Sequence, residues 1–131
     1  MAKYLYPAIF IPEEGGGFSV AFPDIKSCYT QGDDLQDAYE MAADVLCLTL
    51  YGLEEEKAVI PPASDPKDIK TPANSFVSLV GADTLEYRKF YDNKAVKKTL
   101  TVPSWLNTMA EREDINFSQV LQEALKERLK V

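Results

Sequence analysis

Histidine is absent from this chain. Without an imidazole, the chain alone cannot build a histidine-activated serine or cysteine nucleophile, nor a histidine-ligated zinc or nickel site. Cysteine occurs only twice, at Cys28 and Cys47, which is too few for a disulfide framework or a metal cluster. We interpret both as small buried hydrophobic residues. We therefore expect no cofactor.

Long apolar runs are also lacking. No stretch is long enough to cross a membrane, and residues 1–7 lack the uninterrupted apolar segment of a signal peptide. We therefore expect a cytoplasmic protein without a membrane partner. A length of 131 residues with 46% hydrophobic content suffices for one modest core, or for a smaller core with a dimerising appendage.

Charge is distributed unevenly along the chain. Residues 1–92 carry 16 acidic and 7 basic side chains, a balance of −9, whereas residues 93–131 carry 5 acidic and 7 basic side chains, a balance of +2. An acidic part repels DNA and suits a basic protein partner, and a mildly basic part suits a phosphate backbone. Solubility alone explains the −9 equally well. We place the domain boundary at this change of sign, giving domains 1–92 and 93–131.

Apolar and polar side chains alternate without interruption over residues 96–103. One parity holds Val96, Lys98, Leu100 and Val102, and the other holds Lys97, Thr99 and Thr101. This is the period of a half-buried strand. No second strand is predicted downstream, so its backbone groups would pair with the same strand of a second copy. The pattern predicts a homodimer whose antiparallel ribbon fits the major groove of DNA and presents lysines and threonines to it.

The N-terminal part predicts a β-sheet. Residues rich in aromatic and β-branched side chains, separated by turns, predict four strands, over residues 4–11, 18–22, 28–31 and 76–80. Pro7 suits an edge position or a bulge in the first of them. The triple glycine at 15–17 lacks the lysine and helix start of a phosphate-binding loop, so we interpret it as a flexible hairpin tip.

The longest predicted helix begins at Asp33, with Gln36 completing a capping box. Its apolar residues recur at spacings of three and four and should form one buried stripe: Leu35, Ala38, Tyr39, Ala42, Val45, Leu46, Thr49 and Leu53. Its acids (Asp34, Asp37, Glu40 and Asp44) lie on one solvated face, whereas a two-metal nuclease site needs carboxylates that converge from several elements. Residues 54–57 and 60–66 are predicted to be solvated connectors. Asp83 with Glu86 is predicted to open a short helix over residues 84–91.

Two amphipathic helices are predicted in the C-terminal part. Pro103 or Ser104 starts the first, whose Leu106, Met109 and Ala110 share a face, and Trp105 is expected at the edge of the dimer. Ser118 is expected to cap the second. Free N–H groups at the start of this second helix suit a DNA phosphate, which makes candidate DNA contacts of Asn116, Ser118 and Gln119. The alternative is that Ser118 only caps the helix.

Two sets of residues resemble known families. One set comprises residues 97–103, Leu106, Ala110, residues 115–118, Leu121, Ala124 and Leu125, and it resembles the ribbon-helix-helix repressors. The other comprises residues 22–25, 28–32, the helix from Asp33 and residues 60–64, and it is similar to the HicB antitoxins. One branch of that family carries a ribbon-helix-helix tail, and together the two sets cover nearly the whole chain.

This resemblance implies an α+β fold with two functions. The N-terminal domain would be a partial RNase H-like sheet with a packed helix that has lost nuclease chemistry and caps a small basic HicA-type toxin that cleaves mRNA. The C-terminal ribbon-helix-helix domain would bind operator DNA and repress transcription of its own operon. Lys97, Thr99 and Thr101 would reach base edges, and Lys98 would lie over the dimer with its ammonium near a phosphate. Residues that contact the toxin are not assigned, and further assembly of dimers through the N-terminal domains stays open.

Two positions depart from the family pattern. The family usually has glycine where this chain has Lys26 or Ser27, and related tails have glycine at Asp114, which suggests a left-handed backbone there. An alternative function is a stand-alone repressor whose N-terminal domain senses a small molecule; the lack of histidine argues against nickel as that effector. An enzyme with RNase H-type activity is a third hypothesis.

Overall fold

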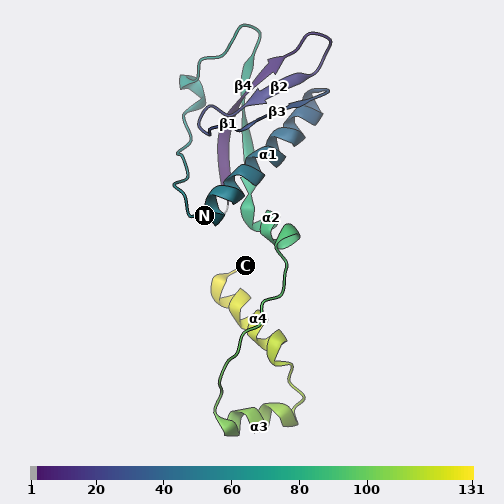
Figure 1. Ribbon diagram of the computed structural model, residues 1–131, viewed down its shortest axis with the longest axis vertical. Coiled ribbons are helices and arrows are strands. Elements are labelled where there is room, and N and C mark those ends of the chain that lie inside the picture. Colours follow the sequence, from purple (N-terminus) through teal and green to yellow (C-terminus); the bar gives the residue numbers. More distant parts are fainter. Residues whose placement is uncertain (1–2) are drawn as a thin grey trace. The chain divides into compact units, whose positions relative to one another are not determined.

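The computed structural model describes residues 3–131 and divides into two compact units, which meet between Lys94 and Ala95. We call the unit up to Lys94 the body and the unit Ala95–Val131 the tail. The body holds the four strands and the helices α1 and α2, and the tail holds α3 and α4 (Figure 1). The division lies two residues beyond the change of charge in the sequence. Each unit is described by itself below.

The body contains one antiparallel sheet with the strand order β3-β2-β1-β4. Its strands are β1 (Lys3–Pro12), β2 (Phe18–Ala21), β3 (Tyr29–Gly32) and β4 (Phe76–Asp83). All four predicted strands are therefore present. The last strand is three residues longer than predicted because its ladder with β1 continues to the pair Lys3–Asp83.

Pro7 lies in a part of β1 that is paired on one side only. It stands opposite Leu79 of β4, and the ladder between β1 and β2 begins only at Ile9. The missing N–H of proline therefore leaves no gap in a ladder with β2. The predicted edge position is correct in this local sense, although β1 as a whole is an inner strand.

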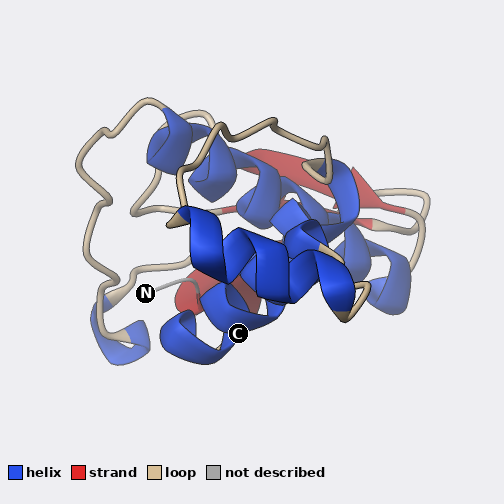
Figure 2. Ribbon diagram, turned by 90° about the horizontal axis from the view of Figure 1, so that it is seen from below, coloured by secondary structure: helices blue, strands red, loops and turns tan. Residues whose placement is uncertain are grey.

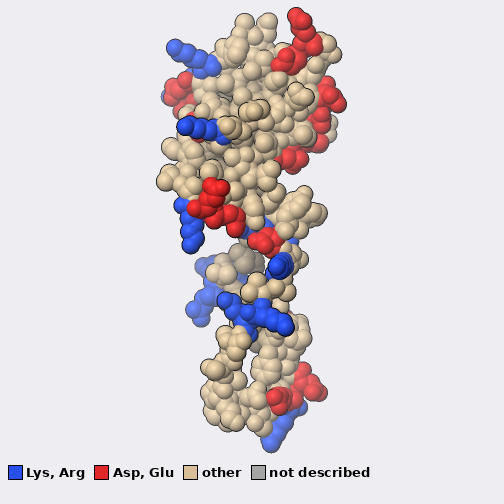
Figure 3. Space-filling view, in the orientation of Figure 1, with Lys and Arg blue, Asp and Glu red and all other residues tan. Residues whose placement is uncertain are grey.

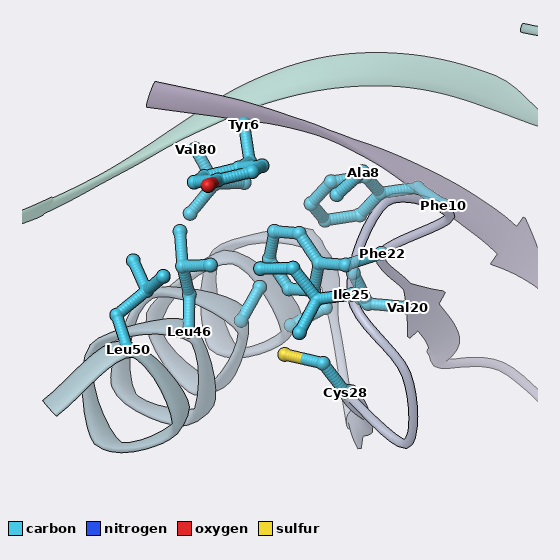
Figure 4. Close-up of a cluster of buried hydrophobic side chains, with 12 residues drawn as sticks. Tyr6, Ala8, Phe10, Val20, Phe22, Ile25, Cys28, Leu46, Leu50 and Val80 are labelled. Carbon is cyan, nitrogen blue, oxygen red and sulfur yellow. The ribbon is translucent and has the colours of Figure 1, made fainter. Parts of the chain in front are cut away.

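Helix α1 (Leu35–Glu55) covers one face of the sheet and closes the core (Figure 4). The core consists of buried side chains from β1, β2, the turn before β3, α1 and β4: Tyr6, Ala8, Phe10, Val20, Phe22, Ile25, Cys28, Ala38, Ala42, Leu46, Leu50 and Val80. On α1 the fully buried residues follow every fourth position, so the buried stripe is narrower than predicted. Leu35 and Tyr39 are 50% and 42% exposed, whereas Leu50, which the prediction omitted, is fully buried.

The start of α1 is shifted by one residue from the prediction. Asp34, not Asp33, is the N-cap, and its side chain accepts a hydrogen bond from the Asp37 N–H at 2.8 Å. The Asp37 carboxylate in turn accepts from the Asp33 N–H at 2.8 Å, so Asp37 takes the place predicted for Gln36. Two neighbouring aspartates both suit a cap, and the sequence pattern alone did not separate them.

The connection from α1 to β4 is fixed to the body at several points. The Tyr6 hydroxyl donates to the Pro61 carbonyl, and the Asp24 carboxylate accepts from the backbone N–H of Ser64 at 2.9 Å and from its hydroxyl. A short 3-10 helix, η1 (Pro66–Asp68), interrupts the loop. The predicted solvated connector is wrong for Glu54 and Glu55, because both belong to α1.

Helix α2 (Thr84–Tyr91) follows β4 directly, as predicted. Its N-cap is Asp83, whose carboxylate accepts from the N–H groups of Leu85 at 3.0 Å and Glu86 at 3.2 Å. Figure 2 shows the structure from below, with helices in blue, strands in red and loops and turns in tan.

The tail consists of an irregular segment over residues 95–103, helix α3 (Ser104–Arg112) and helix α4 (Phe117–Leu129). Within the part of the chain that the structure describes, residues 96–102 are neither helical nor paired with the sheet of the body. Asn116, not Ser118, caps α4, since its side-chain oxygen accepts from the Gln119 N–H at 3.1 Å. The predicted cap is therefore wrong by two residues.

A left-handed residue follows α3, as predicted for Asp114. Asp114 has a φ of +53°. The N–H of Ile115 bonds back to the Ala110 carbonyl at 3.1 Å, and the N–H of Asp114 bonds to the Glu111 carbonyl at 3.1 Å, which is a Schellman ending. Ser27 has the same backbone conformation, with a φ of +58°, in the turn before Cys28.

Candidate functional site

In residues 96–102, the two alternating sets of side chains have different surroundings. Lys98, Leu100 and Val102 line an open hollow of about 520 Å³ together with residues of α3 and α4: Asn107, Phe117, Ser118, Val120, Leu121 and Ala124. Lys97, Thr99 and Thr101 do not line it, and all three are exposed. The mainly apolar set, which contains Lys98, Leu100 and Val102, therefore faces the apolar side of α4. The set that is predicted to contact DNA does not.

The tail has no core of its own. Neither α3 nor α4 buries a single residue. Leu100 is 64% exposed and Trp105 is 66% exposed, and apolar side chains along both helices are similarly open: Leu106, Met109, Ile115, Phe117, Val120, Leu125 and Leu129. An exposed apolar surface of this extent is typical of a protein–protein or membrane interaction site or of a ligand-binding groove.

The candidate residues at the start of α4 are only partly available. The side-chain oxygen of Asn116 is occupied by the cap, and the Gln119 amide donates to Glu123 at 3.2 Å. Ser118 is exposed in the first turn of α4 and lines the same hollow as Lys98. Ser118 and Lys98 thus share one hollow, and Asn116 has a structural role as the cap of α4.

A polar cluster in the body was not predicted from the sequence. Glu54 near the end of α1 accepts hydrogen bonds from the Tyr4 hydroxyl at 2.6 Å, from Thr84 at 2.9 Å and from Arg88 at 3.0 Å. Arg88 also pairs with Glu55, and its guanidinium lies over the Tyr51 ring, 4.6 Å from the ring centre. These contacts hold α2 against α1. The run of three glutamates at 54–56 was the only signal, and it gave no indication of a partner.

The same cluster shifts the pKa values of its members. The hydrogen bond to Glu54, followed by burial, raises the pKa of Tyr4 to about 12. Burial of Glu54 would raise its pKa, but the hydrogen bonds from Tyr4, Arg88 and Thr84 outweigh burial and hold it below its usual value. Hydrogen bonds to Glu55 and Glu54 raise the pKa of Arg88. All of these groups keep their ordinary charge at neutral pH.

The described residues show no metal-binding cluster. In residues 3–131, no three or more cysteine, aspartate or glutamate side chains converge as ligands, and this includes the acids of α1. Cys28 is buried as predicted, whereas Cys47 is only half-buried. None of the helices in the same range is both long and apolar enough to cross a membrane.

These features define a two-part protein, with an acidic sheet-and-helix body and a small tail that leaves its apolar face open. Figure 3 shows acidic side chains spread over the body among a few basic ones, and side chains of both signs on the tail. A family model described as HicB_like antitoxin of bacterial toxin-antitoxin system matches residues 5–73. The chain belongs to this family.

Two curated relatives are similar to part of the chain. Antitoxin HicB 1 of Photorhabdus laumondii is 34% identical over 91 residues, which cover 68% of this chain and 56% of the relative. Antitoxin HicB of Escherichia coli K12 is 36% identical over 56 residues, which cover 43% of this chain and 41% of the relative. The chain thus spans about half the length of the curated relatives it matches.

Solved structures are similar over larger shares of the chain. A toxin-antitoxin complex from Streptococcus pneumoniae contains a chain that is 28% identical with a TM-score of 0.60, and the match covers 96% of this chain and 99% of that one. A HicA3 and HicB3 toxin-antitoxin complex gives 26% identity and a TM-score of 0.51 over 61% of this chain and 99% of that one. The antitoxin HicB of Burkholderia pseudomallei, at 19% identity and a TM-score of 0.56 over 96% and 98% of the two chains, shows the same fold.

Proposed function

We propose that this chain is an antitoxin with two activities. Its body binds and neutralises a small, basic, mRNA-cleaving toxin of the HicA type, and its tail represses transcription of its own operon. Membership of the HicB-like family supports the first activity, as do two structural neighbours that come from toxin-antitoxin complexes. The acidic charge of the body favours a basic partner.

The single observation that supports the second activity is that the tail has no hydrophobic core of its own. Leu100 and Val102 face the apolar side of α4 and still leave that face open. Pairing residues 96–102 with the same segment of a second copy would satisfy the free backbone groups and cover both apolar faces. The tail is then a ribbon-helix-helix domain joined by an intermolecular antiparallel ribbon, and the protein is a homodimer.

The dimer would contact DNA through the other alternating set of side chains in the ribbon. Lys97, Thr99 and Thr101 from each subunit would enter the major groove, and Lys98 with Ser118 would contact the phosphate backbone. Gln119 and Asn116 would contribute mainly through the N-terminal end of α4, because the cap occupies the Asn116 side chain. The body is proposed to be a partial RNase H-like sheet without nuclease activity.

The DNA half of this proposal is tested with operator DNA. Lys97→Ala and Thr99→Ala should each weaken sequence-specific binding by about 1–3 kcal/mol per lost base contact. Lys89→Ala in the body removes the same charge as Lys97→Ala and serves as the control. Unchanged operator affinity in both tail variants would refute the ribbon assignment.

The toxin half is tested by an RNA-cleavage assay with the purified toxin. The full-length protein should abolish cleavage at equimolar amounts. Purification from the native cell separates this function from the sensor alternative, because an antitoxin retains a very small basic protein and a sensor retains a metabolite. A chain that copurifies with neither and leaves cleavage unchanged is not an antitoxin.

A further inference from the structure

Apolar side chains are exposed where α1 and α2 meet in the body. They border an open hollow of about 470 Å³, which we call the α1–α2 hollow, lined by Asp44, Cys47, Leu48, Glu86, Tyr87, Phe90 and Tyr91. Leu48 is 54% exposed, Phe90 78% and Tyr91 68%. Such large side chains, gathered around one concave site, form the kind of apolar centre that protein interfaces bury.

The walls of this hollow are held in place. Arg88 fixes α2 to α1 through Glu54 and Glu55, and it stacks on Tyr51. Tyr51 and Tyr87 have ring centres 4.9 Å apart, and Tyr87 and Tyr91 have ring centres 4.6 Å apart. The aromatic surface is thus preorganised, which reduces the entropy lost when a partner binds.

The charged residues around the α1–α2 hollow indicate the kind of partner that would bind there. Among the residues that the structure describes, the charged ones lining the α1–α2 hollow are Asp44 and Glu86, so acidic side chains border its apolar surface. The nearby Lys89 is paired with Glu86 at 3.2 Å on the exposed side of α2. A segment that carries apolar side chains flanked by lysine or arginine complements this surface. A symmetric contact with a second copy would place acidic rim against acidic rim, which costs free energy.

We propose that the α1–α2 hollow is the docking site of the basic toxin, a proposal that rests on the function proposed above. The toxin inserts apolar side chains between Leu48 and Phe90, and its cations lie near Asp44 and Glu86. The occupant is a basic protein and not a small ligand, because the hollow is open to solvent and its side chains Leu48, Phe90 and Tyr91 remain largely exposed.

The apolar part of the proposal is tested by the affinity of the full-length protein for the purified toxin. Leu48→Ala combined with Phe90→Ala should weaken binding at least tenfold. Leu79→Ala is the matched control, because Leu79 is 43% exposed on β4 with the parity opposite to the buried Val80, and it should change affinity less than twofold. Unchanged operator binding and circular dichroism show that the variants are folded.

The charged part is tested by the salt dependence of binding. Asp44→Asn with Glu86→Gln should slow association and flatten the dependence of the dissociation constant on salt. The control is Glu14→Gln with Asp68→Asn, which removes the same charge from exposed positions elsewhere in the body. Equal effects of the two pairs would show that only the total charge matters, and this outcome would overturn the assigned site.

Cys47 provides an independent footprint. It lines the α1–α2 hollow, whereas Cys28 is 2% exposed and serves as the internal control. Toxin binding should protect Cys47 from alkylation, measured by mass spectrometry. Wild-type protein that does not bind toxin refutes the proposed function, whereas wild-type protein that binds it with Cys47 unprotected and the alanine variants unimpaired refutes only this site. A loss of higher assemblies in the alanine variants without toxin would instead assign the hollow to a second copy.

Discussion

The Arg88 guanidinium of α2 donates a hydrogen bond to the Glu54 carboxylate of α1 at 3.0 Å, with side chains only 29% and 19% exposed. Together with the Arg88–Glu55 pair and the hydrogen bond from Thr84 to Glu54, this ion pair joins the two helices. Because it is shielded from water, it stabilises the body more than an exposed pair would.

Replacement of Arg88 should therefore loosen α2. We expect Arg88→Gln to lower the free energy of unfolding of the body by about 2 kcal/mol, because Glu54 and Glu55 both lose the cation that pairs with them. Lys89→Gln breaks the exposed pair with Glu86 on the same helix and should cost less than about 0.5 kcal/mol. Urea unfolding of both variants measures the difference. Equal losses would show that Arg88 acts only as a surface charge.

Tyr4→Phe should change how stability depends on alkaline pH. At pH 8 the variant should be about 1–2 kcal/mol less stable, because it lacks the hydrogen bond to Glu54. The pKa of Tyr4 is about 12 when folded against an ordinary 10, so this contribution is complete below pH 10 and disappears as the pH rises toward 12. Unfolding at pH 8, 10 and 11 should show the gap between wild type and variant narrowing above pH 10. A gap that stays constant would contradict the assigned pKa.

Two glycines should respond to alanine with opposite signs. A Cβ on Gly32 would overlap the backbone of Ala38, so Gly32→Ala must push α1 away from β3 and should cost more than about 2 kcal/mol. A Cβ on Gly52 meets nothing within 4 Å, so Gly52→Ala should stabilise α1 by up to about 1 kcal/mol. Thermal unfolding compares the two, and a stabilising Gly32→Ala would refute the close approach of helix and strand.

Asp114→Gly should stabilise the tail by about 0.5–1 kcal/mol. A left-handed φ of +53° is unfavourable for aspartate and neutral for glycine. The neighbouring Glu113, at a φ of −91°, is the control, since glycine there only adds flexibility to the unfolded chain and should destabilise. Hydrogen exchange of the α3 and α4 amides in the full-length protein reports both. Slower exchange in both variants would point to a cause other than backbone strain.

Local patterns in the sequence predicted most of the elements of this fold. Alternation and helical spacing located the four strands and the helices, and Asp83 marked the start of α2 correctly. The caps at Asp34 and Asn116 were each misplaced by a residue or two, because several polar residues adjoin each helix start and only the backbone geometry selects one.

Contacts between distant residues were beyond the reach of these patterns. The Glu54 cluster joins residues 50 and 34 positions apart, and a run of glutamates gives no sign of such partners. The exposed Leu35 was predicted to be buried because helical spacing does not tell where a helix crosses its sheet. The DNA-contacting residues and the pairing of the ribbon stay predictions, since they depend on a second chain and on DNA.

The open apolar face of the tail has a further consequence in the proposed dimer. Because that face is covered only when two copies associate, the protein concentration sets the fraction of ordered tails. Dilution should unfold the tails, whereas the body has a buried core of its own and stays folded. Repression would then depend on the concentration of the protein. At low concentration each copy could still neutralise one toxin molecule, and only a high concentration would switch off transcription of the operon.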